Sequence, residues 1–363
     1  MEKKEKPATK ICKYCQSEIP GGAKVCPSCG KKVKGGPAKW IVLGIAAVLL
    51  LAVLIGGDGD GGDEGTKKVG EVGPSAGTSG SVSSGASGSS APQTDVKTVY
   101  KVGDILQDGD MKIVYTASGE YKEDNEFLQA DEGYKYIYLS FAFENTSDKD
   151  NASVSFYSFS CFADGYAAEM HYAGDDDLSA SLSPGRFTSG SVYFMVPEDA
   201  SDIEIEYETN VFTSEKINFV YDGEQDSGYV QQKDITPSEN ACHIGDIVEI
   251  RKLRVSYLSC EDDKSDNMFI KPKEGNKYIT ASFEFENLGD SDQFVSSLDF
   301  NCYADGASCN SAHFRDDSLS ATMSAGRKAK GTVTFEVPRD AVAVEIEFSP
   351  NIWSDERAVF AAN

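Results

Sequence analysis

An internal repeat in the C-terminal part of the chain constrains its fold more than any other feature. Residues 102–105 read VGDI and return at 244–247 as IGDI. The second copy then lacks one residue, so that 161–165 (CFADG) match 302–306 (CYADG). A repeat of this kind predicts two copies of one domain in tandem. The other matched segments are 132–137 with 274–279, 141–145 with 283–287, 178–180 with 319–321, 196–197 with 337–338 and 210–212 with 351–353.

Apolar and polar residues alternate along the matched segments. Successive side chains of a β-strand point to opposite faces, so this period of two predicts strands with one buried face. On this pattern Glu345 and Glu347 lie on a polar face. Dipeptides typical of turns occur at 108–109, 164–165 and 184–185. The predicted core positions are Ile137, Leu139, Phe141, Phe143, Val192, Phe194, Val196, Ile203, Ile205 and Tyr207 in the first copy, and Ile279, Ala281, Phe283, Phe285, Val333, Phe335, Val337, Val344, Ile346 and Phe348 in the second.

The fold class that follows is mainly β. Each copy is expected to form about seven short antiparallel strands in an immunoglobulin-like sandwich of two sheets. The first sandwich is predicted at 95–221 and the second at 242–363, with a linker at 222–241. The tandem sandwiches are expected to follow a zinc ribbon and one transmembrane helix.

The zinc ribbon is predicted at residues 11–33, from two Cys-x-x-Cys pairs: Cys12 with Cys15, and Cys26 with Cys29. Four thiolates at this spacing hold a tetrahedral zinc ion, which replaces a hydrophobic core that so short a segment cannot build. Two disulfides or a redox-active pair are the alternatives, although the redox pair lacks its usual βαβ context. Four thiolates leave no open coordination position, so the zinc site is predicted to be structural. The segment resembles the short zinc ribbons at the N-terminus of many bacterial membrane proteins, whose second pair also reads CPxCG.

Residues 40–57 contain no charged side chain and are predicted to form the transmembrane helix. As a helix they span about 27 Å, close to the roughly 30 Å of bilayer hydrocarbon. Lysines precede the segment at 31–39 and acidic residues follow it at 58–64. Positive charge stays on the cytoplasmic side, so a single-pass protein of the cell membrane is expected, with its N-terminus cytoplasmic and its C-terminal domains extracellular. A buried core helix and a cleaved signal peptide are the alternatives; the long preceding segment argues against cleavage.

Residues 58–94 are rich in glycine and serine and are predicted to be a disordered linker. The chain as a whole is acidic, with 59 acidic residues against 34 basic ones and a formal net charge of -25. Binding of phosphates requires neutralising cations, so nucleic acid is not expected as a partner of the larger part.

The repeated pattern resembles a family of bacterial extracytoplasmic domains of unknown function. It consists of an opening V-G-D, a central Y-x-x-x-x-F-x-F-x-N strand, a D-G turn and a V-P-x-x-A closing strand, over residues 100–221 and 242–362. The resemblance implies an immunoglobulin-like β-sandwich similar to that of a secreted mycobacterial immunoprotective antigen. It also implies a location outside the membrane, often behind an N-terminal anchor, and it carries no assigned activity.

No catalytic residue is predicted, and the chain is expected not to be an enzyme. Its three histidines, His171, His243 and His313, lie in no recognised catalytic motif, and none occupies the same position in both copies. They are interpreted as isolated surface residues.

Two further features leave alternatives open. Acidic residues at 175–177 and 316–317 occupy matched positions on a predicted loop, where carboxylates suit a calcium ion; a solvated acidic loop is the alternative. Tyr134, Tyr136 and Tyr138 lie on one predicted strand and either pack against cross-strand neighbours, which we favour, or form a binding stripe.

The cysteines of the repeat also leave alternatives. Cys161 and Cys302 occupy matched positions beside aromatic residues and are predicted to be buried free thiols. An oxidising exterior would also permit disulfides between Cys242 and Cys260 or between Cys302 and Cys309. Because the repeat holds five cysteines, at least one stays unpaired within the chain.

These features predict a non-catalytic, membrane-anchored extracytoplasmic protein of a binding, sensing or adhesion type, with a cytoplasmic structural zinc ribbon. Its extracytoplasmic ligand or protein partner is not specified by the sequence. The alternative is a transmembrane regulator whose ribbon contacts nucleic acid or a cytoplasmic protein through its lysines. Those lysines are already accounted for by the predicted topology.

Overall fold

The structure is a computed structural model. It describes residues 9–11, 18–20, 66–72, 98–172, 178–210, 215–265, 270–350 and 356–362. The chain separates into two compact units, Met1–Asp63 and Glu64–Asn363.

The described part of the first unit is a hairpin of β1 (Thr9–Ile11) and β2 (Glu18–Pro20), which pair antiparallel. The predicted zinc ligands Cys12, Cys15, Cys26 and Cys29 lie outside the described residues, as does the predicted transmembrane segment 40–57. Within the part of the chain that the structure describes, no helix combines the length and the apolar character needed to cross a membrane.

The second unit contains two β-sandwiches. The strands of the first are β3 (Lys67–Glu71), β4 (Val99–Tyr100), β5 (Asp104–Asp108), β6 (Met111–Tyr121), β7 (Tyr134–Asn145), β8 (Ala152–Ser155), β9 (Phe159–Ala163), β10 (Tyr166–Ala167), β11 (Glu169–His171), β12 (Ser179–Leu182), β13 (Phe187–Pro197), β14 (Ile203–Asn210), β15 (Glu215–Val220) and β16 (Gln225–Asp226).

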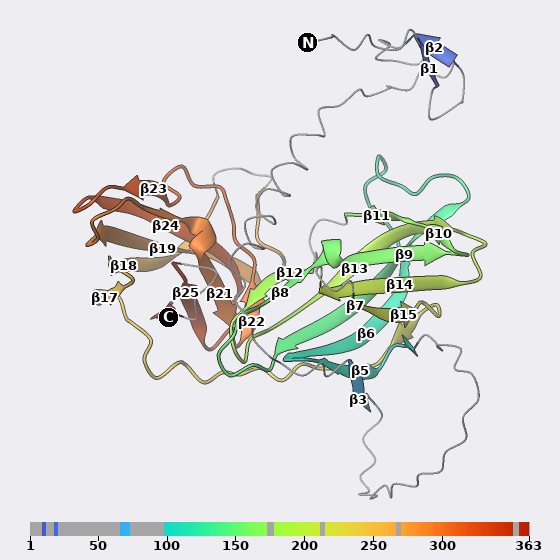
Figure 1. Cartoon of the computed structure of the whole chain (residues 1–363), viewed down its shortest axis with the longest axis horizontal. Coiled ribbons are helices and arrows are strands. Elements are labelled where there is room, and N and C mark those ends of the chain that lie inside the picture. Colours follow the sequence, from blue (N-terminus) through green and yellow to red (C-terminus); the bar gives the residue numbers. More distant parts are fainter. Residues whose placement is uncertain are drawn as a thin grey trace, which may run out of the picture. The chain divides into compact units, whose positions relative to one another are not determined.

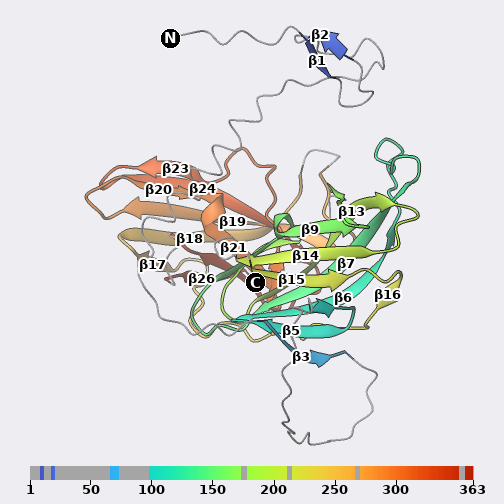
Figure 2. The ribbon, with the colours of Figure 1, turned by 45° about the vertical axis from the view of Figure 1, so that its right-hand side comes forward.

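The two main sheets of the first sandwich pack face to face (Figures 1 and 2). One sheet has the order β13-β7-β6-β5-β3, with β11 beside β13 and β16 beside β6. The other has the order β10-β9-β14-β15-β4. A short pair of β12 and β8 and a single 3-10 turn at Phe156–Ser158 complete it.

The second sandwich repeats this plan. Its strands are β17 (Ile247–Ile250), β18 (Leu253–Asp263), β19 (Asn276–Asn287), β20 (Gln293–Ser296), β21 (Phe300–Ala304), β22 (Ala307–Cys309), β23 (Ser320–Met323), β24 (Lys328–Pro338), β25 (Val344–Phe348) and β26 (Ala358–Ala361). Strands β17-β18-β19-β24 form one sheet and β26-β25-β21-β22 form the other, with β20 and β23 as a short pair and a 3-10 turn at Ser297–Asp299.

All the predicted core positions are buried, which confirms the alternation found in both copies. Each core is built on the same aromatic pair: Tyr115 stacks on Phe141 in the first sandwich, and Tyr257 stacks on Phe283 in the second, with ring centroids 4.9 and 5.1 Å apart. The mainly β fold and the repeat are therefore confirmed. The strands are longer than the short ones predicted, since β7 and β19 each have 12 residues.

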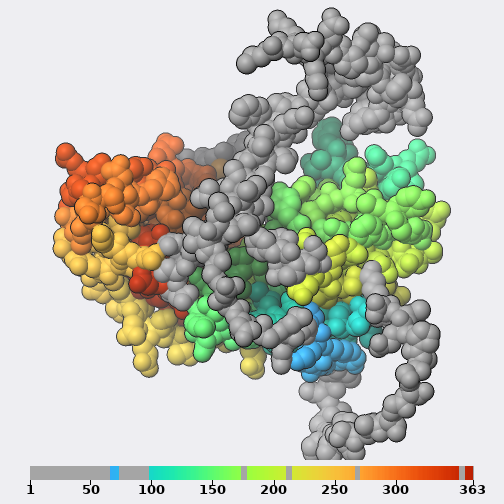
Figure 3. Space-filling view, in the orientation of Figure 1, coloured from blue at the N-terminus to red at the C-terminus, as the bar shows by residue number. Residues whose placement is uncertain are grey.

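The prediction of a disordered linker over 58–94 is wrong at β3, which pairs antiparallel with β5. The Lys68 ammonium lies 2.6 Å from the Asp104 carboxylate, and the Thr66 hydroxyl donates to Asp108. These contacts hold a segment that has almost no apolar side chain to bury. Figure 3 shows β3 in blue at the surface, next to the strands of the first sandwich drawn in cyan.

The predicted linker at 222–241 also begins with ordered structure, because β16 pairs with β6. Ser227 then extends the contact, its backbone N–H and its hydroxyl both donating to the Thr116 carbonyl at 2.9 and 2.8 Å. The start of this linker therefore belongs to the first sandwich.

Candidate functional site

The asparagine of the repeated F-E-N motif closes a loop in each sandwich. Asn145 donates to the backbone carbonyls of Asp150 and Leu182, both at 2.8 Å, and accepts from the Ser147 N–H at 3.0 Å. Asn287 makes the equivalent three bonds in the second sandwich. Both side chains are fully buried, so the motif has a structural role in this fold.

The repeated aspartate-glycine turn has a similar role. Asp305 accepts from the backbone N–H groups of Val342 and Ala343 at 2.9 and 2.8 Å, and Asp164 accepts from those of 201 and 202. Both aspartates have a positive φ, of 49° and 50°, which aspartate tolerates better than most residues. The most strictly repeated residues therefore stabilise the fold, and they are not candidates for a binding site.

The two sandwiches meet where a loop of the first contacts one sheet of the second. We call residues 183–187 the docking loop, and we call Tyr303, Glu345 and Glu347 on the outer side of β21 and β25 the acceptor face. Strand β13, which begins within the docking loop, joins β22 through a parallel bridge between Phe187 and Ala307. Figure 1 shows β22 next to β12 and the start of β13.

One arginine, whose side chain is 14% exposed, links the two sandwiches at this junction. The Arg186 guanidinium donates to Glu345 at 2.5 Å and to Glu347 at 3.1 Å, and lies 4.7 Å from the centre of the Tyr303 ring. Glu345 and Glu347 are only 3% and 2% exposed. Burial alone would raise the pKa of Glu345, but hydrogen bonds from Arg186 and Ser238 outweigh it and lower that pKa. The charges of Arg186, Glu345 and Glu347 are therefore paired at the junction.

Hydrogen bonds from uncharged donors complete the contact. The Ser183 hydroxyl donates to Glu347 at 2.5 Å, and the Tyr303 hydroxyl donates to the Ser181 carbonyl at 2.7 Å. The linker takes part, since the Ser238 N–H donates to Glu345 at 2.6 Å. Together these bonds fix the second sandwich against the first.

The alternation rule correctly placed Glu345 and Glu347 on the outer face of their sheet. Their assignment to a polar, solvent-facing side is wrong, because the first sandwich covers that face. Arg186 was not among the residues predicted to be functional. The available signal was its repetition, since Ser-x-Gly-Arg occurs at both 183–186 and 324–327.

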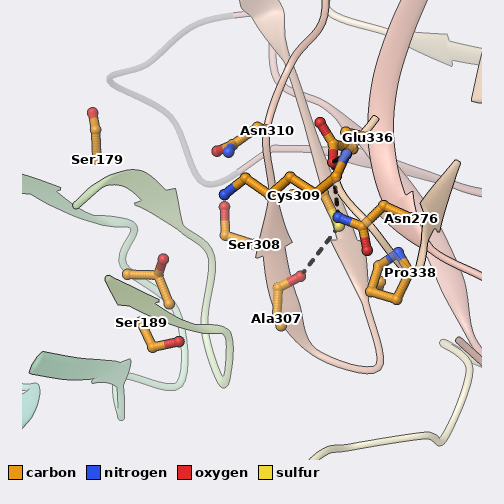
Figure 4. A pocket seen from close by; sticks show the side chains of 12 residues that line it. Ser179, Ser189, Asn276, Ala307, Ser308, Cys309, Asn310, Glu336 and Pro338 are labelled. Carbon is orange, nitrogen blue, oxygen red and sulfur yellow. Dashed lines mark hydrogen bonds between the residues drawn. The ribbon is translucent and has the colours of Figure 1, made fainter. Parts of the chain in front are cut away.

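Beside the docked surfaces lies a hollow of about 190 Å³, which we call the junction hollow. Figure 4 shows Ser179 and Ser189 of the first sandwich on one side and Asn310 and Glu336 of the second on the other. The Glu336 carboxylate is held by the Asn276 amide at 2.8 Å and by a backbone N–H at 2.7 Å. The complete lining is Ser179, Thr188, Ser189, Lys273, Asn276, Ala304, Ala307, Ser308, Cys309, Asn310, Glu336 and Pro338.

Half of the residues that line the junction hollow carry a hydroxyl or an amide group. Such groups donate and accept hydrogen bonds, and they suit a small polar ligand. Among these lining residues there is one carboxylate, Glu336, and no histidine. Acid–base chemistry on a glycosidic bond uses two carboxylates, so the hollow is better suited to binding than to that reaction.

The histidine prediction is wrong for His171. Its ring stacks on Tyr136, with centroids 4.0 Å apart, and its Nε2 lies 2.9 Å from the Glu123 carboxylate. A backbone N–H and His171 both donate to Glu123 and lower its pKa. His171 is therefore part of a packed cluster that sequence spacing does not reveal. His243 and His313 are exposed, as predicted.

Cross-strand packing is confirmed for two of the three predicted tyrosines. The Tyr136 hydroxyl donates to the Leu128 carbonyl at 2.9 Å, in addition to the stacking on His171. Tyr138 is paired across the sheet with Gly119 and is half-buried. Tyr134 is 42% exposed.

The calcium prediction falls partly outside the described residues, which exclude 173–177. In the second copy, Asp317 accepts hydrogen bonds from Arg315 and from the Thr332 hydroxyl, so its carboxylate is already engaged. The described parts of the chain contain no group of three or more His, Cys, Asp or Glu residues arranged to hold a metal ion.

The cysteines of the repeat are free thiols in the structure. Cys161 and Cys302 are buried, as predicted, and burial raises the pKa of Cys161 to about 12. Cys302 lies opposite Cys309 on the neighbouring strand, and burial together with the Cys309 thiol raises the pKa of Cys302. Cys242 lies in an isolated bridge with Phe360.

Both sandwiches match the same protein-family model. A family model described as a domain of unknown function, DUF4352, matches residues 100–217 and again 242–359. The chain belongs to this family. Each match corresponds to one sandwich, so the predicted resemblance to domains of unknown function is confirmed for both DUF4352 domains. No curated protein matches the chain.

Several solved structures show partial similarity. The ycdA protein of Bacillus subtilis is 15% identical over 32% of this chain and 37% of its own length, with a TM-score of 0.29. The yjhA protein of Bacillus subtilis is 12% identical over 33% of this chain and 98% of its own, with a TM-score of 0.28. The secreted protein MPT63 of Mycobacterium tuberculosis is 12% identical over 34% of this chain and 99% of its own, with a TM-score of 0.26.

Proposed function

We propose that this chain is a non-catalytic, membrane-anchored extracytoplasmic binding protein, and that its tandem DUF4352 domains bind a small polar ligand in the junction hollow. Residues 40–57 would be the anchor, and the zinc ribbon at 11–33 would lie on the cytoplasmic side. The observation that supports the binding role is the hollow itself, which is lined by side chains from both sandwiches.

The chemistry of the hollow points to a ligand rich in hydroxyl groups. Ser189, Ser308 and Asn310 offer donors and acceptors, and Glu336 is oriented by Asn276 to accept from a ligand hydroxyl. The volume is smaller than the roughly 300–1,000 Å³ that drug-sized ligands occupy. One sugar ring of a cell-surface carbohydrate matches these properties.

Calorimetric titration tests the proposal. N-acetylglucosamine oligomers, as the probe, are titrated into residues 64–363, which form a compact unit. We expect saturable binding that is lost in Ser189→Trp, because the indole ring fills the hollow. Ser291→Trp is the matched control, since Ser291 is exposed on a loop away from the hollow. Absence of saturable binding, or equal binding by Ser189→Trp, contradicts the proposed ligand class, and turnover of the oligomers contradicts the non-catalytic role.

Topology is tested separately in intact cells. A cysteine introduced by Ser83→Cys is expected to react with a membrane-impermeant thiol reagent, while the four cysteines between 12 and 29 do not react. The unsubstituted chain serves as the control for the cysteines of the sandwiches. Reaction of the N-terminal cysteines without permeabilisation contradicts the proposed orientation.

A further inference from the structure

The contact between the two sandwiches uses different surfaces on its two sides. The first sandwich contributes the docking loop, and the second contributes the acceptor face. A contact of this kind is heterologous, and repetition of a heterologous contact produces rings or open chains of molecules. Because the two sandwiches are copies of one domain, each also carries the surface that the other uses.

The second sandwich has its own docking loop at 324–328, which we call the second docking loop. It reads Ser-Ala-Gly-Arg-Lys, where the first reads Ser-Pro-Gly-Arg-Phe. All five of its residues are exposed, whereas Arg186 is held against two buried glutamates. Among the described residues, the Arg327 side chain has no hydrogen-bond or ion-pair partner.

The first sandwich has its own acceptor face on the outer side of β9 and β14, which we call the first acceptor face. It consists of Phe162, Glu204 and Glu206, at the positions of Tyr303, Glu345 and Glu347. A basic neighbour is also retained: Lys216 lies 2.7 Å from Glu206, as Arg357 lies 3.8 Å from Glu347. All three side chains are partly exposed.

The turn beside each acceptor face shows where a docking loop fits. A Cβ atom placed on Gly306 would lie 3.0 Å from the Phe187 ring, because the docking loop packs there. A Cβ atom placed on the equivalent Gly165 would meet nothing within 4 Å. Among the described residues, the space that a docking loop fills in the second sandwich is therefore open in the first.

We propose that a second copy of this chain docks its second docking loop on the first acceptor face, so that molecules associate head to tail. Arg327 would enter between Glu204 and Glu206, as Arg186 enters between Glu345 and Glu347. The charges of the two surfaces are complementary, although the whole chain is acidic. The proposal is independent of any ligand in the junction hollow.

The contact between chains is expected to be weaker than the contact within one chain. Phe162 lacks the hydroxyl with which Tyr303 accepts from the Ser183 N–H of the docking loop, and Lys328 replaces the apolar Phe187. The contact within the chain also gains from the linker, which raises the effective concentration of its partner surface. Association is therefore expected to increase with concentration.

Sedimentation velocity of residues 64–363 over a range of concentrations tests the proposal. The unsubstituted unit is expected to form species larger than a dimer as its concentration rises. Arg327→Ala removes the charge of the second docking loop, and Glu206→Arg reverses that of the first acceptor face, so each variant alone is expected to remain a monomer. An equimolar mixture of the two variants retains one working contact and is expected to stop at a dimer.

Arg339→Ala is the control, since Arg339 is exposed just beyond the other end of β24. This variant is expected to associate as the unsubstituted unit does. Unchanged melting temperatures establish that each variant is folded. The proposal is overturned if the unsubstituted unit is monomeric at every concentration, if it stops at a dimer, or if both variants still associate alone. It is also overturned if their mixture stays monomeric.

Discussion

At the scale of single residues, the asparagine of the F-E-N motif has the clearest testable role. Asn145→Ala is expected to lower the free energy of unfolding by about 2–3 kcal/mol, because two carbonyls and one N–H lose their partner in a buried loop. Urea denaturation measures this change. Asn218→Ala, on the outer side of β15, is the control and should stay within about 0.5 kcal/mol of the unsubstituted unit. An equal effect of both substitutions would show that the loop does not depend on Asn145.

Single residues also show how far sequence reasoning reaches. Phe141 and Phe283 could be placed in the core because alternation is a local property, and the two copies share its phase. Glu345 could not be recognised as buried, since its partner Arg186 lies 159 positions away and belongs to the other sandwich. Alternation tells which face of a sheet a residue occupies, but it does not tell what covers that face.

At the scale of elements, β3 is held by charge rather than by apolar contact. Lys68→Glu places a second carboxylate beside Asp104, which is 3% exposed, and is expected to release β3 from β5. Hydrogen exchange of the backbone amides of residues 67–71 should then increase at least tenfold. The same substitution at Lys122, exposed on a distant loop, should leave this exchange unchanged. Retained protection in Lys68→Glu would show that the ion pair does not hold the strand.

Strand β3 also shows why an element can escape prediction. It lies in a segment whose composition of glycine and serine predicts disorder, and its five residues include one apolar side chain larger than glycine. Pairing with the edge of a folded sheet supplies backbone hydrogen bonds that composition does not register. The long strands β7 and β19 carried a strong periodic signal, and they were the elements predicted best.

At the scale of the whole molecule, Arg186 is expected to couple the unfolding of the two sandwiches. Arg186→Ala leaves the buried Glu345 without its cation and leaves Glu347 only the more distant Arg357, at 3.8 Å. Breaking a buried ion pair in this way typically costs about 3–5 kcal/mol. We expect one calorimetric unfolding transition to separate into two, one for each sandwich. Arg327→Ala is the control, because it changes the same position of the repeat where that position is exposed. A single transition in Arg186→Ala would show that other contacts suffice to couple the sandwiches.

The same junction should make the coupling of the sandwiches depend on pH. The hydrogen bonds from Arg186 and Ser238 lower the pKa of Glu345 below its ordinary value of 4.5, so the docked state favours the carboxylate. The resulting stabilisation is fully present above that value and is lost as pH falls through the lower pKa of the docked state. Calorimetric scans between pH 7 and pH 3 should therefore show the single transition separating into two below about pH 4.5. In Glu345→Gln the group cannot titrate, so the separation should depend less on pH across this window. If Glu345→Gln and the unsubstituted unit follow the same pH profile, other carboxylates control the junction.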